Sequence, residues 1–193
     1  IFLQSDLFNA NQRPAIDVGI SVSRVGGAAQ VKAMKKVAGT LKIGLAQYRD
    51  MEAFAMFASD LDAASRRQLD RGARLVELLR QPQYSPYPVA EQVISVWAGT
   101  TGEFDSVPVN ELLGFEREFL DHLRHNTKVL ETIAQTGDFD ADTQQATKDA
   151  LAQFRTQWVS GGGESLVSGD QAAEAMADED MDHEQIVVNR KRS

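Results

Sequence analysis

Arg24 stands out among the residues of this sequence that could take part in chemistry. It follows four apolar residues that alternate with polar residues or glycine, namely Ile16, Val18, Ile20 and Val22. Gly26 and Gly27 come shortly after it and allow a phosphate or another chain to approach the backbone. The guanidinium is permanently charged and forked, which matches the oxygens of a phosphoryl group. These features suit a phosphate-contacting arginine, but spacing alone favours the alternative, a strand-end arginine in an ordinary ion pair.

The other candidates for chemistry are weaker. His122 and His125 lie three positions apart and share a helix face, but no further histidine or acidic residue completes a metal site, so we predict none. The sequence contains no G-x-x-x-x-G-K-[ST] phosphate loop and no nucleophile next to an evident base. By itself, this stretch of chain does not read as a self-contained enzyme.

The element expected to position Arg24 is a strand over residues 15 to 23, because apolar residues alternate there with period two. A single strand cannot satisfy its own backbone, and no partner strand is evident downstream. Since the chain begins at Ile1 without an initiator methionine, we expect a fragment of a longer protein whose N-terminal part supplies the sheet.

From about Ala28 the apolar spacing becomes helical, and we expect five or six helices in a bundle. A long helix runs to about Phe54, and a second begins at Ser59, Asp60 or Asp62 and ends at Pro82. A shorter helix ends near Gly99. One helix from Pro108 to Gly137 and a last one capped by Asp140 or Asp142 complete the bundle. The expected buried face of the helix after Pro108 consists of Leu112, Phe115, Phe119, Leu123, Val129 or Leu130, and Ile133.

Composition limits the classes of function. The net charge is −8, so we do not expect a general nucleic-acid binder, and no apolar run approaches the roughly 18 residues of a membrane span. Residues 160 to 193 hold 8 acidic and 3 basic side chains, and 7 of the acidic ones lie between Asp170 and Glu184. Such a segment buries too little apolar area to offset its ordering entropy, so we predict a flexible, acidic tail.

Several stretches resemble the alpha subunit of the rotary F-type ATP synthase over about residues 1 to 157. They are "RPAIDVGISVSRVGGAAQVKAMKKVAGTLKIGLAQYR", "SDLD", "LLRQPQYSP" and "EQVISVWAG", in the order of that family. "SVSRVG" and "RQPQYSP" favour the alpha over the related beta subunit. The tail resembles the C-terminal extensions of mycobacterial and related actinobacterial enzymes. The resemblance implies three regions: the end of an α/β nucleotide-binding domain (1–27), a C-terminal helical bundle (28–158) and an acidic, largely disordered extension (159–193).

In that family three alpha and three beta subunits alternate around a central rotor. The resemblance implies that Arg24 reaches the beta-subunit catalytic site as an arginine finger on the γ-phosphate, and that Ser21 helps to hold this interface loop. It further implies that alpha carries a nucleotide that is not turned over, with adenine contacts from Phe8, Arg13, Pro14, Gln81 and Gln83. The nucleotide is ATP or ADP with Mg²⁺, and its phosphate loop is expected outside this fragment.

We therefore expect a non-catalytic, regulatory subunit of a proton-translocating ATP synthase, peripheral on the cytoplasmic face of the plasma membrane. Its expected partners are the beta subunits, the gamma rotor subunit and the delta subunit of the peripheral stalk. The acidic tail is a candidate for restraining ATP hydrolysis. The alternative is a helical scaffold or interaction module in which Arg24 has no direct role in chemistry.

Overall fold

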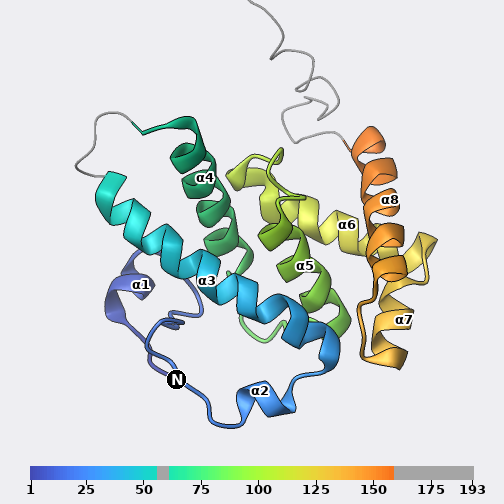
Figure 1. Cartoon of the computed structure of the whole chain (residues 1–193), viewed down its shortest axis with the longest axis horizontal. Coiled ribbons are helices and arrows are strands. Elements are labelled where there is room, and N and C mark those ends of the chain that lie inside the picture. Colours follow the sequence, from blue (N-terminus) through green and yellow to red (C-terminus); the bar gives the residue numbers. More distant parts are fainter. Residues whose placement is uncertain (56–60, 159–193) are drawn as a thin grey trace, which may run out of the picture.

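A computed structural model describes residues 1–55 and 61–158, and this part of the chain is built of helices (Figure 1). This confirms the mainly helical fold. Two short helices come first, α1 (Ser5–Asn9) and α2 (Gly26–Ala29), followed by α3 (Lys32–Ala55) and α4 (Ala63–Leu78). The remaining elements are α5 (Val89–Thr101), a 3₁₀ turn (Val109–Glu111), α6 (Leu112–Asn126), α7 (Val129–Thr136) and α8 (Ala141–Gln157).

Two acidic caps begin helices where the sequence indicates. The Asp62 carboxylate accepts the Ser65 backbone N–H at 2.6 Å and starts α4. The Asp140 carboxylate accepts the Thr143 N–H at 2.8 Å and starts α8. Each bond satisfies one of the amide groups that a first helical turn leaves without an internal partner. The other caps considered for α4, Ser59 and Asp60, lie outside the described residues.

Two helix ends differ from the prediction. Helix α5 ends at Thr101, two residues after Gly99, and is capped by Gly102, whose φ of 87° is the left-handed conformation that suits a glycine cap. The single helix expected from Pro108 to Gly137 is interrupted between α6 and α7, where Thr127 is extended. The Thr127 hydroxyl donates to the Leu123 carbonyl at 2.8 Å and accepts the Val129 N–H at 3.3 Å. A threonine that binds its neighbouring backbone in this way competes with helix continuation.

The strand predicted over residues 15 to 23 does not form in this structure, and in that respect the prediction was wrong. Leu3 and Ile16 make one isolated antiparallel bridge, residues 18 to 20 form a turn, and no strand is present in 1–55 or 61–158. The alternating pattern describes a chain with one apolar face, but strand geometry also requires neighbours that accept and donate the backbone hydrogen bonds. Ile20 and Val22 are 51% and 77% exposed.

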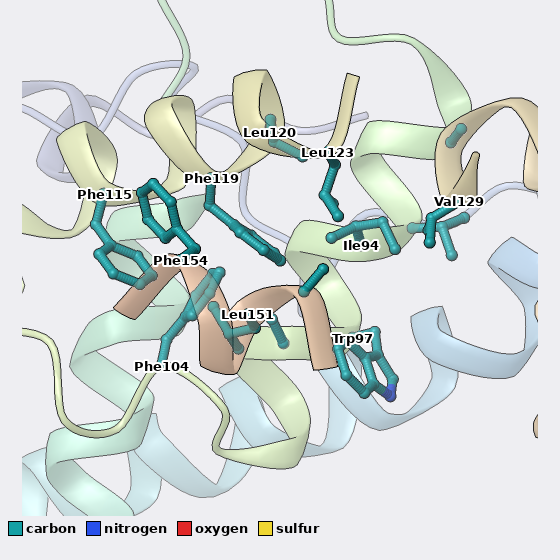
Figure 2. Packing of buried hydrophobic residues seen from close by; sticks show 14 of the residues in the cluster. Ile94, Trp97, Phe104, Phe115, Phe119, Leu120, Leu123, Val129, Leu151 and Phe154 are labelled. Atoms are coloured by element: carbon teal, nitrogen blue, oxygen red, sulfur yellow. The ribbon is translucent and has the colours of Figure 1, made fainter. Parts of the chain in front are cut away.

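The core lies among α5, α6, α7 and α8 and is rich in aromatic rings (Figure 2). Phe104, Phe115 and Phe119 are each at most 1% exposed, and the Phe104 ring packs edge-on against Phe115 with centroids 5.5 Å apart. The Trp158 ring packs edge-on against Phe115 at 5.0 Å, directly after the end of α8. The expected buried face of the segment after Pro108 is confirmed, with Val129 buried and Leu130 partly buried.

Helices α3 and α4 pack closely because Gly72 has no side chain. A Cβ at Gly72 would lie 2.2 to 2.5 Å from atoms of the Tyr48 side chain. The first turn of α3 is fixed to the turn between α7 and α8: Lys32 and Lys36 contact the Asp138 carboxylate at 2.5 and 2.6 Å. Both contacts bring segments far apart in sequence against α3, which crosses the molecule in Figure 1.

Within 1–55 and 61–158, none of the helices has the length and apolar character needed to cross a membrane. The predicted acidic extension, residues 159–193, lies outside the described residues, and the proposed boundaries of the three regions stay predictions.

Candidate functional site

Arg24 lies on the surface, in the two-residue turn that leads into α2. Its neighbours Val22 and Val25 are 77% and 68% exposed. Among the residues that the structure describes, no hydrogen bond or ion pair involves the Arg24 side chain. The hydroxyl of the preceding residue, Ser23, accepts the Gly26 N–H at 2.8 Å, and this contact shapes the start of α2. The guanidinium is thus presented to the outside, and the alternative of an ordinary ion pair has no partner in this part of the chain.

Ser21 anchors the segment that precedes Arg24. Its hydroxyl accepts the backbone N–H of Phe2 at 3.0 Å, and its own N–H donates to the Asp17 carbonyl at 3.1 Å. Of the two residues predicted for the interface loop, Ser21 is therefore held by hydrogen bonds within the protein, whereas Arg24 is exposed. The exposed member is the one whose chemistry suits an external phosphate.

Asp17 accepts several hydrogen bonds that hold this region together, and its role was not predicted from the sequence. Its Oδ1 accepts from Gly19 N–H at 2.7 Å and from Arg49 Nη1 at 2.8 Å, and its Oδ2 accepts from Gln4 Nε2 at 2.8 Å. The residue is 7% exposed, and the hydrogen bond from Arg49 lowers the pKa of its carboxyl group. The spacing Asp-x-Gly is typical of a carboxylate that caps its own turn, so this signal was available in the sequence.

Four of the five residues expected to contact adenine lie together. The Arg13 guanidinium carbon lies 4.5 Å from the centre of the Phe8 ring, a cation–π contact. A cis peptide bond joins Arg13 to Pro14, and the Arg13 carbonyl accepts the Gln81 backbone N–H at 2.9 Å. These contacts bring α1 and the loop before α2 against the segment that follows α4.

This group of side chains has a flat aromatic surface open to solvent. Phe8 is 53% exposed, and Gln81 is also exposed. Arg13 is oriented by a second bond, in which Nη1 donates to the Asn11 amide oxygen at 2.6 Å. The fifth predicted residue, Gln83, is exposed and makes no side-chain hydrogen bond within the described residues. An exposed ring beside a guanidinium and an amide is suited to stacking on a planar, polar heterocycle.

Two pockets of similar size lie against α3. One, of about 330 Å³, is bounded by the N-terminal segment and α4 and is lined by Leu7, Gln12, Ile16, Tyr48, Arg49 and Val76 among others. Burial and a hydrogen bond to Glu52 raise the pKa of Tyr48 to about 12. The other pocket, of about 350 Å³, lies between α3 and α4 and includes Arg67 and Arg71. Neither lining contains Phe8, Arg13 or Arg24, so the predicted contact residues form an open surface instead.

His122 and His125 do not converge on a common point. The His122 ring packs against Phe154 with centroids 5.5 Å apart, whereas His125 Nδ1 lies 2.8 Å from the Asp121 carbonyl oxygen on the surface. In the part of the chain that the structure describes, no three histidine, cysteine, aspartate or glutamate side chains cluster as metal ligands would.

Comparison with known proteins gives concordant matches. Residues 30–154 match the family model described as "ATP synthase alpha/beta chain, C terminal domain". The chain is 61% identical over 192 residues to ATP synthase subunit alpha of Renibacterium salmoninarum, and 62% identical over 192 residues to that of Leifsonia xyli subsp. xyli. It is 64% identical over 191 residues to the subunit alpha of Cutibacterium acnes.

Each of these alignments covers 99% of this chain and 35% of the relative, so the chain spans about a third of the length of the relatives it matches. The family model ends at residue 154, whereas the alignments with these actinobacterial proteins extend into the acidic C-terminal residues. The C-terminal segment therefore has counterparts in these relatives.

Proposed function

Because the chain belongs to the ATP synthase alpha/beta family, we propose that it is the C-terminal part of an alpha subunit that supplies Arg24 to a neighbouring catalytic site. In this proposal the alpha subunit is non-catalytic and regulatory, and a beta subunit holds the nucleotide that reacts. The exposed guanidinium of Arg24, which has no ion-pair or hydrogen-bond partner within residues 1–55 and 61–158, carries the proposal, because a side chain satisfied within its own chain could not act on another subunit.

The proposed task of Arg24 is electrostatic. Its N–H groups donate to oxygens of the γ-phosphoryl group and stabilise the negative charge that spreads over them during transfer between ADP and water. Arginine suits this task because its fork matches two oxygens and its charge does not depend on pH near neutrality. Ser21 has a different proposed role, since its two hydrogen bonds hold the backbone that leads to Arg24.

We further propose that Phe8, Arg13, Pro14, Gln81 and Gln83 contact the adenine of a second nucleotide that is bound without being turned over. The proximity of Phe8 to Arg13 and of Arg13 to Gln81 supports this assignment. The ring provides a stacking surface, and the amides can pair with the edge of the base. The ligand is ATP or ADP with Mg²⁺, and the groups that bind its phosphates and metal ion are proposed to lie outside these 193 residues.

The proposal extends to an assembly and a place in the cell. Beta subunits, the gamma rotor subunit and the delta subunit of the peripheral stalk are the proposed partners. The proposed assembly translocates protons. The proposed location of this chain within it is peripheral, at the cytoplasmic face of the plasma membrane. The acidic segment from Asp170 to Glu184 is proposed to restrain ATP hydrolysis through contact with a basic surface.

Arg24→Lys in the reconstituted complex tests the central proposal. We expect ATP hydrolysis to fall on the order of a thousandfold while the complex still assembles, since lysine keeps the charge but not the fork. Arg66→Lys is the matched control, because Arg66 is also an exposed arginine and lies on α4. Parent-like hydrolysis by the Arg24→Lys complex would overturn the proposal and favour the helical scaffold alternative.

A further inference from the structure

The ion pair of Asp17 and Arg49 joins two parts of the molecule that are 32 residues apart in sequence. Arg49 belongs to α3, the long helix of the bundle, and Asp17 lies in the segment that leads to Arg24. Their contact, from Nη1 to Oδ1, measures 2.8 Å. The side chain of Asp17 is 10% exposed and that of Arg49 is 42% exposed, so the carboxylate is the enclosed member of the pair.

The same carboxylate oxygen shapes the turn on the way to Arg24. Asp17 Oδ1 accepts the backbone N–H groups of Gly19 at 2.7 Å and of Ile20 at 3.3 Å. The Asp17 carbonyl then accepts the Ser21 N–H, three residues before Arg24. One oxygen atom thus receives donors from the turn and from the bundle, which fixes the position of the turn relative to α3.

Gly19 gives an independent sign that the pair is closely packed. A Cβ at this position would lie 2.9 Å from Arg49 Nη1 and 3.1 Å from Asp17 Oδ1. A Cβ would therefore crowd both groups: the end of the Arg49 side chain would have to shift, and the carboxylate would have to give by a few tenths of an ångström. The arginine reaches the carboxylate directly past the Gly19 backbone.

We propose that Asp17 and Arg49 are positioning residues for Arg24, holding the turn at residues 18 to 20 against α3 so that the guanidinium leaves the surface at a defined place. The proposal rests on the function proposed for Arg24. It has a mechanical corollary: α3 is continuous from Lys32 to Ala55, so a displacement of its C-terminal part moves Arg49, and Asp17 passes the displacement to the segment that carries Arg24.

Three variants disturb the pair in different ways. Asp17→Asn keeps an oxygen for the Gly19 and Ile20 N–H groups but removes the charge that binds Arg49. Arg49→Ala removes the donor and leaves the turn intact. Gly19→Ala keeps both charged groups and places a methyl group between the turn and the guanidinium. Asp105→Asn is the matched control, since Asp105 pairs with Arg71 in another part of the molecule.

ATP hydrolysis by the reconstituted complex is the first readout. We expect each of the three variants to lower kcat about tenfold with KM unchanged, because small misplacements of a catalytic group cost rate without weakening substrate binding. The Asp17→Asn/Arg49→Ala double variant should lose no more than either single variant. In the Arg24→Lys background Asp17→Asn should cause no further loss, and Asp105→Asn should leave kcat at the parent value.

The second readout reports the position of residue 24 and does not depend on activity. The 193 residues contain no cysteine, so Arg24→Cys is a unique labelling site within them; any cysteine elsewhere in the alpha chain is first changed to serine, and the nitroxide is attached to the purified chain before assembly. We expect Asp17→Asn and Arg49→Ala to make this label more mobile, as measured from the line shape of its electron paramagnetic resonance spectrum. A label at Ala152→Cys, exposed on α8, should not respond.

The two readouts separate failure of this inference from failure of the proposed function. Full activity of Arg24→Lys would overturn the arginine-finger role, and the label would still show whether the pair positions residue 24. If Arg24→Lys is inactive but the pair variants change neither kcat nor label mobility, the positioning role is overturned. Additive losses in the double variant would contradict a shared route through one contact.

Discussion

Arg124 of α6 donates from Nε to the Glu91 carboxylate of α5 at 2.8 Å, so one of two carboxylates buried between these helices has a cation. The other, Glu116, is 1% exposed, and no ion pair involves it in the described part of the chain. Burial, reinforced by the nearby negative charge of Glu91, raises the pKa of Glu116 to about 7. The two buried carboxylates therefore differ in environment, since Glu91 has a cation beside it and Glu116 has none within the described residues.

Glu116→Gln should stabilise the chain at neutral and alkaline pH. The pKa of Glu116 is higher in the folded state than its ordinary value of 4.5, so folding favours the protonated form. The contribution of the Glu116 carboxyl group to the free energy of unfolding is therefore most favourable below pH 4.5, and it is lost as the pH rises through 7. The full difference amounts to about 3 kcal/mol in the free energy of unfolding.

Urea unfolding of the 193-residue chain at pH 5 and pH 8 measures this effect. Glu116→Gln should exceed the parent at pH 8 and approach it at pH 5, because the parent carboxyl group is then largely protonated. An equal difference at both pH values would mean that the change acts through packing and not through charge.

The Asp138 contacts should make the chain sensitive to acid. Hydrogen bonds from Lys32 and Lys36 hold the pKa of Asp138 well below its usual range. The stabilisation is therefore present above the unfolded value of 3.8 and is lost as the pH falls through the lower folded value. Asp138→Asn should lower Tm at pH 7 and reduce the loss of Tm between pH 5 and pH 2. Lys35→Gln, at an exposed neighbouring position, is the control and should leave this profile unchanged.

Gly72→Ala should destabilise the packing of α3 on α4. Because the added carbon would meet the Tyr48 side chain at 2.2 to 2.5 Å, either the ring or the helix must shift. We expect a loss of about 1 to 3 kcal/mol, typical of overpacked cores. Gly114→Ala is the matched control, since nothing lies within 4 Å of a Cβ there, and alanine in α6 should stabilise by about 0.5 to 1 kcal/mol. Thermal unfolding of both variants compares the two effects, and a stabilised Gly72→Ala would contradict the close packing.

Deletion of residues 160 to 193 tests the proposed restraint on ATP hydrolysis. If the 7 acidic residues between Asp170 and Glu184 contact a basic surface of the complex, their removal should raise the hydrolysis rate. A variant with these residues changed to asparagine or glutamine separates charge from chain length and should behave like the deletion. Unchanged hydrolysis in both variants would rule out an inhibitory role for the segment.

The helices could be predicted from the sequence because their signals are local. Apolar residues at helical spacing and the caps Asp62 and Asp140 act within a few positions of the chain. The strand over 15 to 23 could not be predicted in the same way, since its formation depends on partners distant in sequence or outside it. The interruption at Thr127 was missed because the apolar period continues across it.

For the candidate site, the sequence indicated which residues to consider but not the contacts that hold them in place. Phe8, Arg13, Pro14 and Gln81 lie together and Arg24 is exposed, and the roles expected of these residues stay predictions. Asp17 was missed because alternation assigned it to a polar face, where no special contact was expected. Its link to Arg49 spans 32 residues, and no periodic pattern encodes such a pairing.

The edge-on packing of Trp158 against Phe115 has a practical consequence for spectroscopy. The sequence contains two tryptophans, Trp97 and Trp158, and both are buried in the aromatic core, at 4% and 6% exposure. The indole emission of this chain therefore comes from the bundle alone and should shift to longer wavelength when the core admits water. Since Trp158 follows the last turn of α8, Trp158→Phe leaves a reporter of the central helices, and Trp97→Phe leaves a reporter of the end of α8.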